Sequence, residues 1–342
     1  MKGVWNLAKR VVRPSPVVGA TPAEVVFTEN KWRLLRYRQR PEGLAFQTPL
    51  LMIPSLINRH YVLDLMPGKS FVEWLVARGH DVWIVDWGTP TSEDRYITFD
   101  EIVDGYLGRA IRRAALSSPR GKTHVLGYCL GGTLAAIHGA AHPERLAGLV
   151  ALAAPIRFGD HGLLERWSRS GDFDLRALVN AFGVVPWPLL QASFHLLRPT
   201  SNLSKAVHVL DRAWDDPFLD GFFALEKWAN DNVSFPGEAY VRYLQSLYRD
   251  DQLAQGTFSL SGRPVKLSAL RCPTLAVTFQ NDTIVPAESA QALIELAGAT
   301  DKQELRLSGG HVGAVVSKAA SGKLWPAVSN WLAARDSDEK PQ

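Results

Sequence analysis

A short glycine-rich segment around Cys129 carries the clearest chemical signal in the chain. Residues 127–131 read Gly-Tyr-Cys-Leu-Gly; they follow an apolar run that predicts a strand and precede small residues that predict a helix. A strand, a Gly-x-Cys-x-Gly turn and a helix make a nucleophile elbow, with cysteine where serine is usual. Such a turn strains the backbone of its nucleophile, and a Cβ at Gly127 or Gly131 would collide with the neighbouring strand or helix. The helix N-terminus favours the thiolate form of Cys129.

An aspartate and a histidine later in the chain complete the constellation. Asp282 follows a predicted strand at 274–279, and His311 follows the next predicted strand. The order nucleophile, acid, histidine is typical of α/β-hydrolases. We therefore expect His311 to take the thiol proton of Cys129, and Asp282 to hold the histidine in the useful tautomer and stabilise its positive charge.

The thiolate would attack a carbonyl carbon, and the resulting oxyanion needs two hydrogen-bond donors. One expected donor is the backbone N–H of Leu130, which directly follows the nucleophile. The other is expected in the loop after the predicted strand at 49–54, at the backbone N–H of Leu56. Hydrolases usually carry His-Gly in this loop, whereas this chain has Pro54-Ser55.

Apolar runs and amphipathic segments predict the elements that position these residues. A hairpin at 25–27 and 32–38 opens the chain, and the later strands are apolar throughout, as suits a parallel sheet covered on both faces. Strands are predicted at 49–54, 81–86, 123–126, 149–152, 274–279 and 304–307, with helices at 70–79, 98–116, 286–297 and in a final segment up to 334. This alternation predicts an α/β-hydrolase fold with a mostly parallel central sheet.

The β/α alternation stops between about residues 156 and 256. This stretch is rich in Trp, Phe, Leu and Pro and lacks strand periodicity, which favours a largely helical cap that gates the site. The core would then consist of residues 1–155, with the elbow, and 257–334, with the acid and the histidine. Residues 335–342 are polar and charged and predict a disordered tail.

Composition narrows the class of protein. The chain has 342 residues, of which 46% are hydrophobic and 21% charged, and a formal net charge of +4. This mixture is typical of a soluble globular protein, and a mildly basic surface suits an anionic substrate such as a coenzyme A thioester. The basic residues do not form a nucleic-acid module. No apolar run approaches the roughly 20 residues of a membrane span.

The cysteine count indicates the redox compartment, and the histidines near the elbow raise the question of a metal site. With Cys129 and Cys272 alone, a reducing cytoplasm is favoured over a disulfide framework, and Cys272 is interpreted as structural. His124, His138, His142 and His161 lie near the elbow in sequence. His138 and His142 are four residues apart on a predicted helix, but the sequence presents no third ligand with them, so packing explains them better than a metal. We expect no metal and no cofactor.

Taken together, these motifs resemble the polyhydroxyalkanoate synthase family, from about residue 21 to residue 332. The elbow carries the resemblance, together with residues 56–65, Asp86-Trp87-Gly88, Glu226-Lys227-Trp228, 282–286 and 309–313. The short length resembles the class III type, whose catalytic subunit works with a second subunit. Leu130 stands where class III members more often carry glutamine.

The resemblance implies an acyltransferase that polymerises (R)-3-hydroxyacyl-CoA into polyhydroxyalkanoate and releases coenzyme A. Cys129 would hold the growing polyester chain as a thioester, His311 would act as base, and Asp282 would help to activate the 3-hydroxyl. It further implies a cytoplasmic enzyme at the surface of polyester granules, a homodimer, and a second synthase subunit as partner.

Two other functions stay open. A thioesterase, esterase or polyester depolymerase would use the same triad and pass the acyl group to water. A catalytically silent scaffold or granule-binding protein would not need the ordered triad, which argues against it. A cap rich in Trp and Phe can exclude water, which favours a hydroxyl acceptor over hydrolysis.

Overall fold

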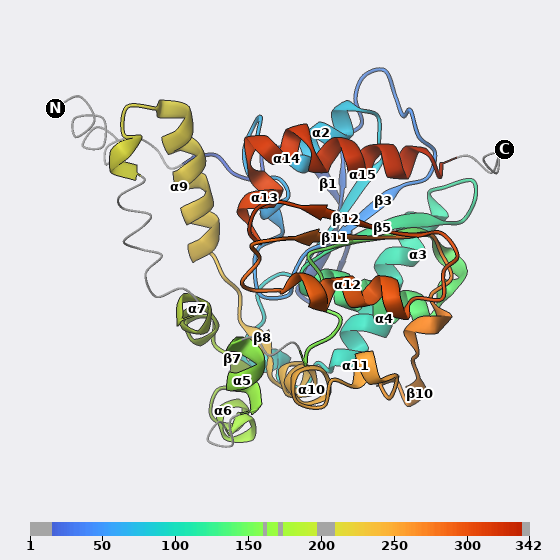
Figure 1. The fold of residues 1–342 in the computed structure, drawn as a ribbon, viewed down its shortest axis with the longest axis vertical. Helices are drawn as coiled ribbons and strands as arrows, with labels where there is room; N and C mark the ends of the chain where they lie inside the picture. The colour runs from blue at the N-terminus through green and yellow to red at the C-terminus, as the bar shows by residue number, and fades with distance from the viewer. Residues whose placement is uncertain (1–15, 160–162, 170–173, 197–208, 337–342) are drawn as a thin grey trace.

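An eight-stranded sheet forms the centre of the computed structural model, which describes residues 16–159, 163–169, 174–196 and 209–336 (Figure 1). Its strand order is β1-β2-β4-β3-β5-β6-β11-β12. The strands are β1 (Ala23–Glu29), β2 (Trp32–Tyr37), β3 (Leu50–Ile53), β4 (Val82–Asp86), β5 (Thr123–Tyr128), β6 (Leu146–Leu152), β11 (Thr274–Phe279) and β12 (Lys302–Leu307). β2 pairs antiparallel with β1 and β4, and the pairs from β4 to β12 are parallel.

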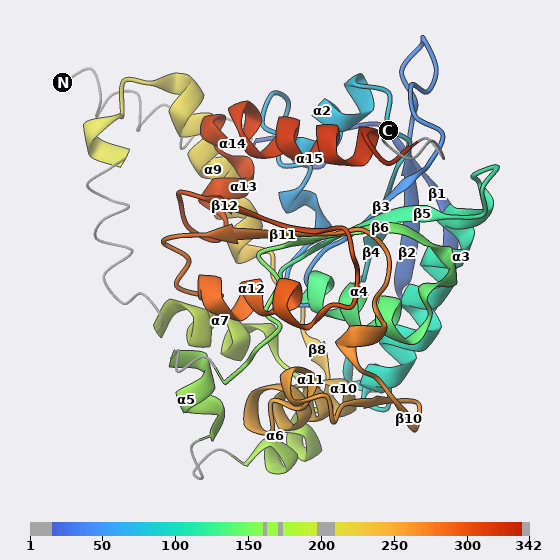
Figure 2. The same cartoon turned by 45° about the vertical axis from the view of Figure 1, so that its right-hand side comes forward.

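Helices cover both faces of this sheet. α2 (Phe71–Ala77) and α15 (Leu324–Ala333) lie on one face, whereas α3 (Gly108–Leu116), α4 (Leu130–Ala141) and α12 (Ala287–Leu296) lie on the other (Figures 1 and 2). Each layer encloses its own apolar core. A strand between two such cores must be apolar on both sides, which is the pattern that predicted this arrangement.

Strand β3 shows how the sequence produces two cores. Its residues are Leu-Leu-Met-Ile, and all four are buried. Leu51 and Ile53 pack into the core under α3 and α4, whereas Leu50 and Met52 pack into the core under α2 and α15. Successive side chains point to opposite faces of a strand, so an unbroken apolar run fills both cores at once.

The predicted strands and helices of the core are confirmed, with boundaries shifted by a few residues. The helix predicted at 98–116 differs in kind. Its first part, η3 (Glu101–Leu107), is a π-helix that runs directly into α3. π-Helical segments are rare and are frequently found at functional sites.

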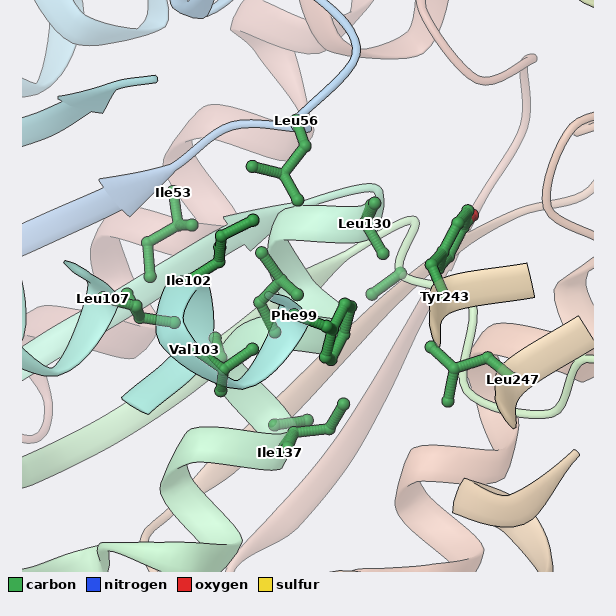
Figure 3. Packing of buried hydrophobic residues seen from close by; sticks show 14 of the residues in the cluster. Ile53, Leu56, Phe99, Ile102, Val103, Leu107, Leu130, Ile137, Tyr243 and Leu247 are labelled. Carbon is green, nitrogen blue, oxygen red and sulfur yellow. The ribbon is translucent and has the colours of Figure 1, made fainter. Parts of the chain in front are cut away.

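The chain between β6 and β11 is mainly helical, as its composition predicts. It contains α5 (Leu163–Arg169), α6 (Leu175–Phe182), α7 (Trp187–Leu196), α9 (Asp216–Asn230), α10 (Gly237–Tyr243), the π-helix η5 (Leu244–Arg249) and α11 (Gln252–Gln255). Two short strands, β7 (Val184–Val185) and β8 (Phe235–Pro236), pair antiparallel within it. Tyr243 and Leu247 of this region belong to the same buried cluster as Leu130 of α4 (Figure 3). The cap boundaries at 156 and 256 stay a prediction.

The predicted disordered tail starts too early. The Arg335 guanidinium pairs with the Asp301 carboxylate, and the Asp336 carboxylate accepts hydrogen bonds from the backbone N–H groups of Gln47 and Thr48. Both residues are therefore tied to the core by partners far away in sequence, and residues 337–342 lie outside the described residues. Over the ranges that the structure describes, we find no helix both long and apolar enough to cross a membrane.

We predict that Gly131→Ala lowers the free energy of unfolding by about 1–3 kcal/mol or more, as overpacking of a core does. A Cβ at Gly131 would lie 2.1 Å from the carbonyl oxygen of Ile53, and backbone cannot rotate away as a side chain can. Gly322→Ala is the matched control, since no heavy atom lies within 4 Å of a Cβ there. Urea denaturation of both variants would contradict the prediction if their midpoints were equal.

Candidate active site

Cys129 lies at the tight turn between β5 and α4, where its backbone is strained. Its φ is 54° and its ψ is −131°, a combination that residues with a side chain rarely adopt. The turn is held by a hydrogen bond from the backbone N–H of Cys129 to the carbonyl oxygen of Leu152, at 2.9 Å. The turn also depends on glycine, because a Cβ at Gly127 would lie 2.3 Å from the Cα of Gly132. The predicted role of the glycines is confirmed.

The half-buried Cys129 side chain borders a cavity of about 360 Å³. Ile57 and Leu130 contribute to its wall from the core, and Trp167 and Tyr243 contribute from the cap region. This lining is mainly apolar and aromatic. A carbonyl substrate would therefore meet the thiol in surroundings from which much of the water is excluded.

Asp282 and His311 meet behind this wall. His311 Nδ1 lies 2.7 Å from Asp282 Oδ2, and both side chains are buried. The other carboxylate oxygen, Oδ1, accepts hydrogen bonds from the backbone N–H groups of Ile284 and Val285, each at 2.9 Å. A carboxylate can only accept, so Nδ1 of His311 must donate its proton to Asp282.

Cys129 lies close enough to His311 to raise the pKa of the imidazole. Because Nδ1 is engaged by Asp282, the second ring nitrogen is the one left for Cys129. The structure thus brings the three residues predicted from the sequence together. Cys129, Asp282 and His311 follow the carboxyl ends of β5, β11 and β12, which meet at one edge of the parallel sheet. This edge is where open α/β sheets generally bind their ligands.

The charge of His311 follows from its neighbours. Burial by itself disfavours the imidazolium, but the Cys129 thiolate and the Asp282 carboxylate outweigh this and raise the pKa of His311 from 6.5 to about 10. At neutral pH the ring is therefore cationic and lies beside the Cys129 sulfur. This arrangement is that of a cysteine nucleophile paired with its base.

Tyr128 is part of the site although the motif does not single it out. Its hydroxyl donates to the carbonyl oxygen of His311 at 3.3 Å, and the two rings lie 5.3 Å apart. Complete burial raises the pKa of Tyr128 well above its usual value, so the phenol stays neutral. The variable position of Gly-x-Cys-x-Gly gives no sign of this contact in the sequence.

Cys272, the second thiol, is buried away from the cavity lining. Burial raises its pKa to about 11, which keeps it protonated and unreactive. Its interpretation as a structural residue agrees with this environment. Cys129 is thus the thiol that borders the cavity.

Of the two expected oxyanion donors, Leu130 borders the Cys129 cavity, whereas Leu56 borders a different pocket and its neighbour Ile57 lines the Cys129 cavity. Leu130 opens α4, and the first N–H groups of a helix have no partner within it. Leu56 is buried in the loop after β3 and belongs to the same apolar cluster as Leu130 (Figure 3). In this loop the backbone N–H of Ile57 points to the Ser55 hydroxyl, at 3.4 Å.

The histidines near the elbow separate into different environments. His124 is buried in β5, in agreement with a packing role. His138 and His142 require a correction, because the sequence presents no third ligand for them and the structure places Asp104 of η3 beside both. This residue precedes them by more than 30 positions, so the helical spacing of the histidines could not reveal it. His161 lies outside the described residues.

Known proteins share both the sequence and the fold of this chain. Residues 15–75 match the family described as the N-terminus of poly-beta-hydroxybutyrate polymerase, and residues 48–315 match the alpha/beta hydrolase fold family. The poly(3-hydroxyalkanoate) polymerase subunit PhaC of Haloferax mediterranei is 36% identical over 95% of this chain and 67% of its own length. The corresponding subunit of Allochromatium vinosum is 33% identical over 92% and 89%.

The chain belongs to the poly(3-hydroxyalkanoate) polymerase family. It is therefore an enzyme of the acyltransferase type, and the family predicted from the motifs is confirmed. The nucleophile elbow of this polymerase carries a cysteine, Cys129, at the position where α/β-hydrolases usually have a serine.

Solved structures confirm the predicted fold class. A Sulfolobus solfataricus protein named as a lipase candidate superimposes with a TM-score of 0.59 at 14% identity, covering 94% of this polymerase and 99% of that chain. A carboxylesterase of Nitrososphaera gargenis gives 0.53 at 16% identity, covering 93% and 100%. At such identities the likeness shows the α/β-hydrolase fold alone.

We predict that Cys129→Ala lowers the pKa of His311 from about 10, because the thiolate is the largest influence that raises it. An NMR titration of the imidazole protons measures this directly. Because the pKa of His311 is raised on folding, the charged ring stabilises the folded state. This stabilisation is complete below pH 6.5 and is lost as the pH rises through about 10. The difference in melting temperature between wild type and variant should therefore shrink across that range. An unchanged pKa in the variant would show that no thiolate acts on His311.

Proposed function

We propose that this polymerase transfers the acyl group of (R)-3-hydroxyacyl-CoA to a growing polyester through a thioester on Cys129. His311 serves as the base and Asp282 as its orienting partner. One observation carries the proposal: a strained cysteine on a cavity wall interacts with the imidazole of His311, and a buried carboxylate accepts from Nδ1 of that ring. This arrangement is that of nucleophile, base and orienting acid in covalent catalysis.

In the first half-reaction the thiolate of Cys129 attacks the thioester carbonyl of the substrate. The bond from Sγ to the acyl carbon forms, the bond to the coenzyme A sulfur breaks, and the imidazolium of His311 protonates that sulfur as it leaves. Thioester exchange is feasible because the two sulfurs leave similarly well. The backbone N–H groups of Leu130 and Leu56 are proposed to stabilise the oxyanion between these steps.

In the second half-reaction the hydroxyl of another 3-hydroxyacyl group attacks the thioester. His311, now neutral, takes the hydroxyl proton, an ester bond forms, and the Cys129 thiolate departs. The cysteine and the histidine regain their opposite charges, so one turnover restores the starting state. No cofactor is required in this scheme, since the thioester itself supplies an activated acyl group.

The geometry favours an indirect role for Asp282. Its two oxygens already accept hydrogen bonds from His311 and from the backbone N–H groups of Ile284 and Val285. We therefore propose that Asp282 acts through His311, and that it does not itself bind the 3-hydroxyl. It fixes the ring tautomer and stabilises the imidazolium.

The wall of the cavity supports transfer to a hydroxyl rather than to water. Trp167, Tyr243 and Tyr248 bring large aromatic surfaces to it, and burial raises the pKa of Tyr243 well above its usual value. A neutral, mostly apolar wall holds an acyl chain and disfavours free water near the thioester.

Contacts between the cap and the core support a gating role for the proposed cap, residues 156–256. The backbone N–H of Val233 donates to the carbonyl oxygen of Ile57 at 3.1 Å, and Trp228 Nε1 donates to the carbonyl oxygen of Arg59 at 2.8 Å. Both acceptors lie in the loop that also carries Leu56. Movement of the cap would thus shift the second oxyanion donor, which couples entry of substrate to assembly of the site.

Family membership supports further proposals about the setting of the enzyme. We propose that it works in the cytoplasm at the surface of polyester granules, as a homodimer and together with a second synthase subunit. An assay with and without a candidate second subunit tests the last point, and sedimentation measures the oligomeric state.

We predict that the chain converts (R)-3-hydroxybutyryl-CoA into polymer with release of coenzyme A, and that Cys129→Ala abolishes both. The variant should keep its fold, because alanine fits where a compact side chain already stands, so its circular dichroism spectrum should match that of the wild type. Release of free 3-hydroxy acid in place of polymer would identify a hydrolase. Turnover by folded Cys129→Ala would disprove covalent catalysis at this residue.

We predict that Asp282→Asn lowers the turnover number by orders of magnitude, because an amide favours the wrong tautomer of His311 and leaves the imidazolium without a counter-charge. Initial rates of coenzyme A release measure the effect. Glu42→Gln makes the same carboxylate-to-amide change at an exposed position and should leave the rate unchanged. A rate above about a tenth of the wild-type value would argue against the orienting role.

A further inference from the structure

A second cluster of functional side chains lies at the end of α4 opposite Cys129. Asp104, His138 and His142 each offer one ligand atom of the kind that binds metals, and these three atoms lie within 4.8 Å of one another. The histidines are one helical turn apart at the C-terminal end of α4, and Asp104 comes from the π-helical segment η3, which packs against it. None of the three belongs to the proposed triad.

His138 is held in the form that ligates a metal. It is 5% exposed, and its Nδ1 donates to the carbonyl oxygen of Val103 at 3.0 Å, so the lone pair of the neutral ring is on Nε2. A backbone carbonyl on the far nitrogen is the usual second partner of a metal-binding histidine.

The carboxylate of Asp104 is also held in place by hydrogen bonds, through both of its oxygens. Its Oδ1 lies 2.6 Å from His142 Nε2, and its Oδ2 accepts a hydrogen bond from the Ser261 hydroxyl at 2.8 Å. The group therefore combines two imidazole rings with a carboxylate whose two oxygens are both held by hydrogen bonds.

We propose that Asp104, His138 and His142 form a zinc site. Two imidazole nitrogens and one carboxylate oxygen are a ligand set that suits Zn²⁺, with water or another protein group in the fourth position. Zinc bonds of about 2.0–2.1 Å place tetrahedral ligands roughly 3.3 Å apart, so the most distant of the three atoms must approach by about 1.5 Å. Asp104 Oδ1 and His142 Nε2, at 2.6 Å, must instead exchange their hydrogen bond and its proton for the metal and move slightly apart. His142 and Asp104 are only partly buried and can make this adjustment.

The surroundings offer room and set the expected affinity. The three residues border a cavity of about 290 Å³ that Glu144, Arg112 and Arg145 also line. Glu144 is a carboxylate that could supply the fourth ligand. The two arginines oppose a cation, so we expect micromolar rather than nanomolar binding. A third arginine on this wall, Arg109, is neutralised by its ion pair with Glu29 at 2.6 Å.

A zinc ion here would join η3 to the helix that presents Cys129 at its other end. Its effect would be structural, because the helix α4 separates the ion from the reacting atoms. Zinc binding should therefore raise the melting temperature by mass action, while the catalytic residues stay as they are.

Titration calorimetry and metal analysis test the site on the full, untagged chain carrying Cys129→Ala. This background is needed because the thiolate of Cys129 and His311 could themselves bind zinc. We expect one Zn²⁺ per chain and a melting temperature that rises with zinc. His142→Ala and Asp104→Asn should each weaken binding by about tenfold or more. Glu93→Gln, at an exposed carboxylate outside the cavity, should have no effect.

Cobalt absorption and an arginine variant test the site independently of zinc titration. Co²⁺ in place of zinc should give the visible absorption of a tetrahedral nitrogen–oxygen site, and His142→Ala should remove it. Arg112→Gln should retain or tighten zinc binding, because it removes a repelling charge. Absence of stoichiometric zinc in the Cys129→Ala protein would overturn the proposal. So would binding that survives both ligand substitutions, or binding that Arg112→Gln abolishes.

Discussion

The close approach of α4 to the sheet is the constraint on which the site depends. Gly127 and Gly131 leave no space for a Cβ, since the backbone of the elbow helix and the carbonyl oxygen of Ile53 occupy it. This contact forces Cys129 into its strained conformation and turns its side chain toward the cavity. The same contact brings the first turn of α4 near the loop that carries Leu56. The positions of the nucleophile and of the proposed oxyanion donors therefore depend on the same packing contact.

A chain of buried charges extends this constraint to the other half of the core. The buried imidazolium of His311 and carboxylate of Asp282 would each be costly to bury alone, but together they compensate one another. Asp282 is further satisfied by two backbone N–H groups, and the raised pKa of His311 shows that attraction to its neighbours exceeds the cost of burial. The charges therefore hold the loops after β11 and β12 against the elbow at β5.

The segment between β6 and β11, proposed here as a cap, lines the Cys129 cavity and packs into the same core. Tyr243 and Leu247 belong to the cluster that contains Leu130, so the cap region is packed onto the elbow rather than attached through a separate interface (Figure 3). Its backbone contacts with Ile57 and Arg59 reach the loop after β3. An aromatic wall that is continuous with the core supplies an apolar surface for an acyl chain, and the described residues of this region that line the cavity are all uncharged.

The sequence by itself determined the features that depend on neighbours along the chain. The elbow glycines, the order of Cys129, Asp282 and His311, and the apolar runs of the strands follow from local turn geometry and from burial on two faces, and they predicted the fold and the family. The tertiary structure alone decided the contacts between distant segments. Asp104 beside His138, Tyr128 against the His311 carbonyl and Arg335 on Asp301 are such contacts. Local periodicity cannot show them, because packing between separate elements, and not spacing within one element, brings these groups together.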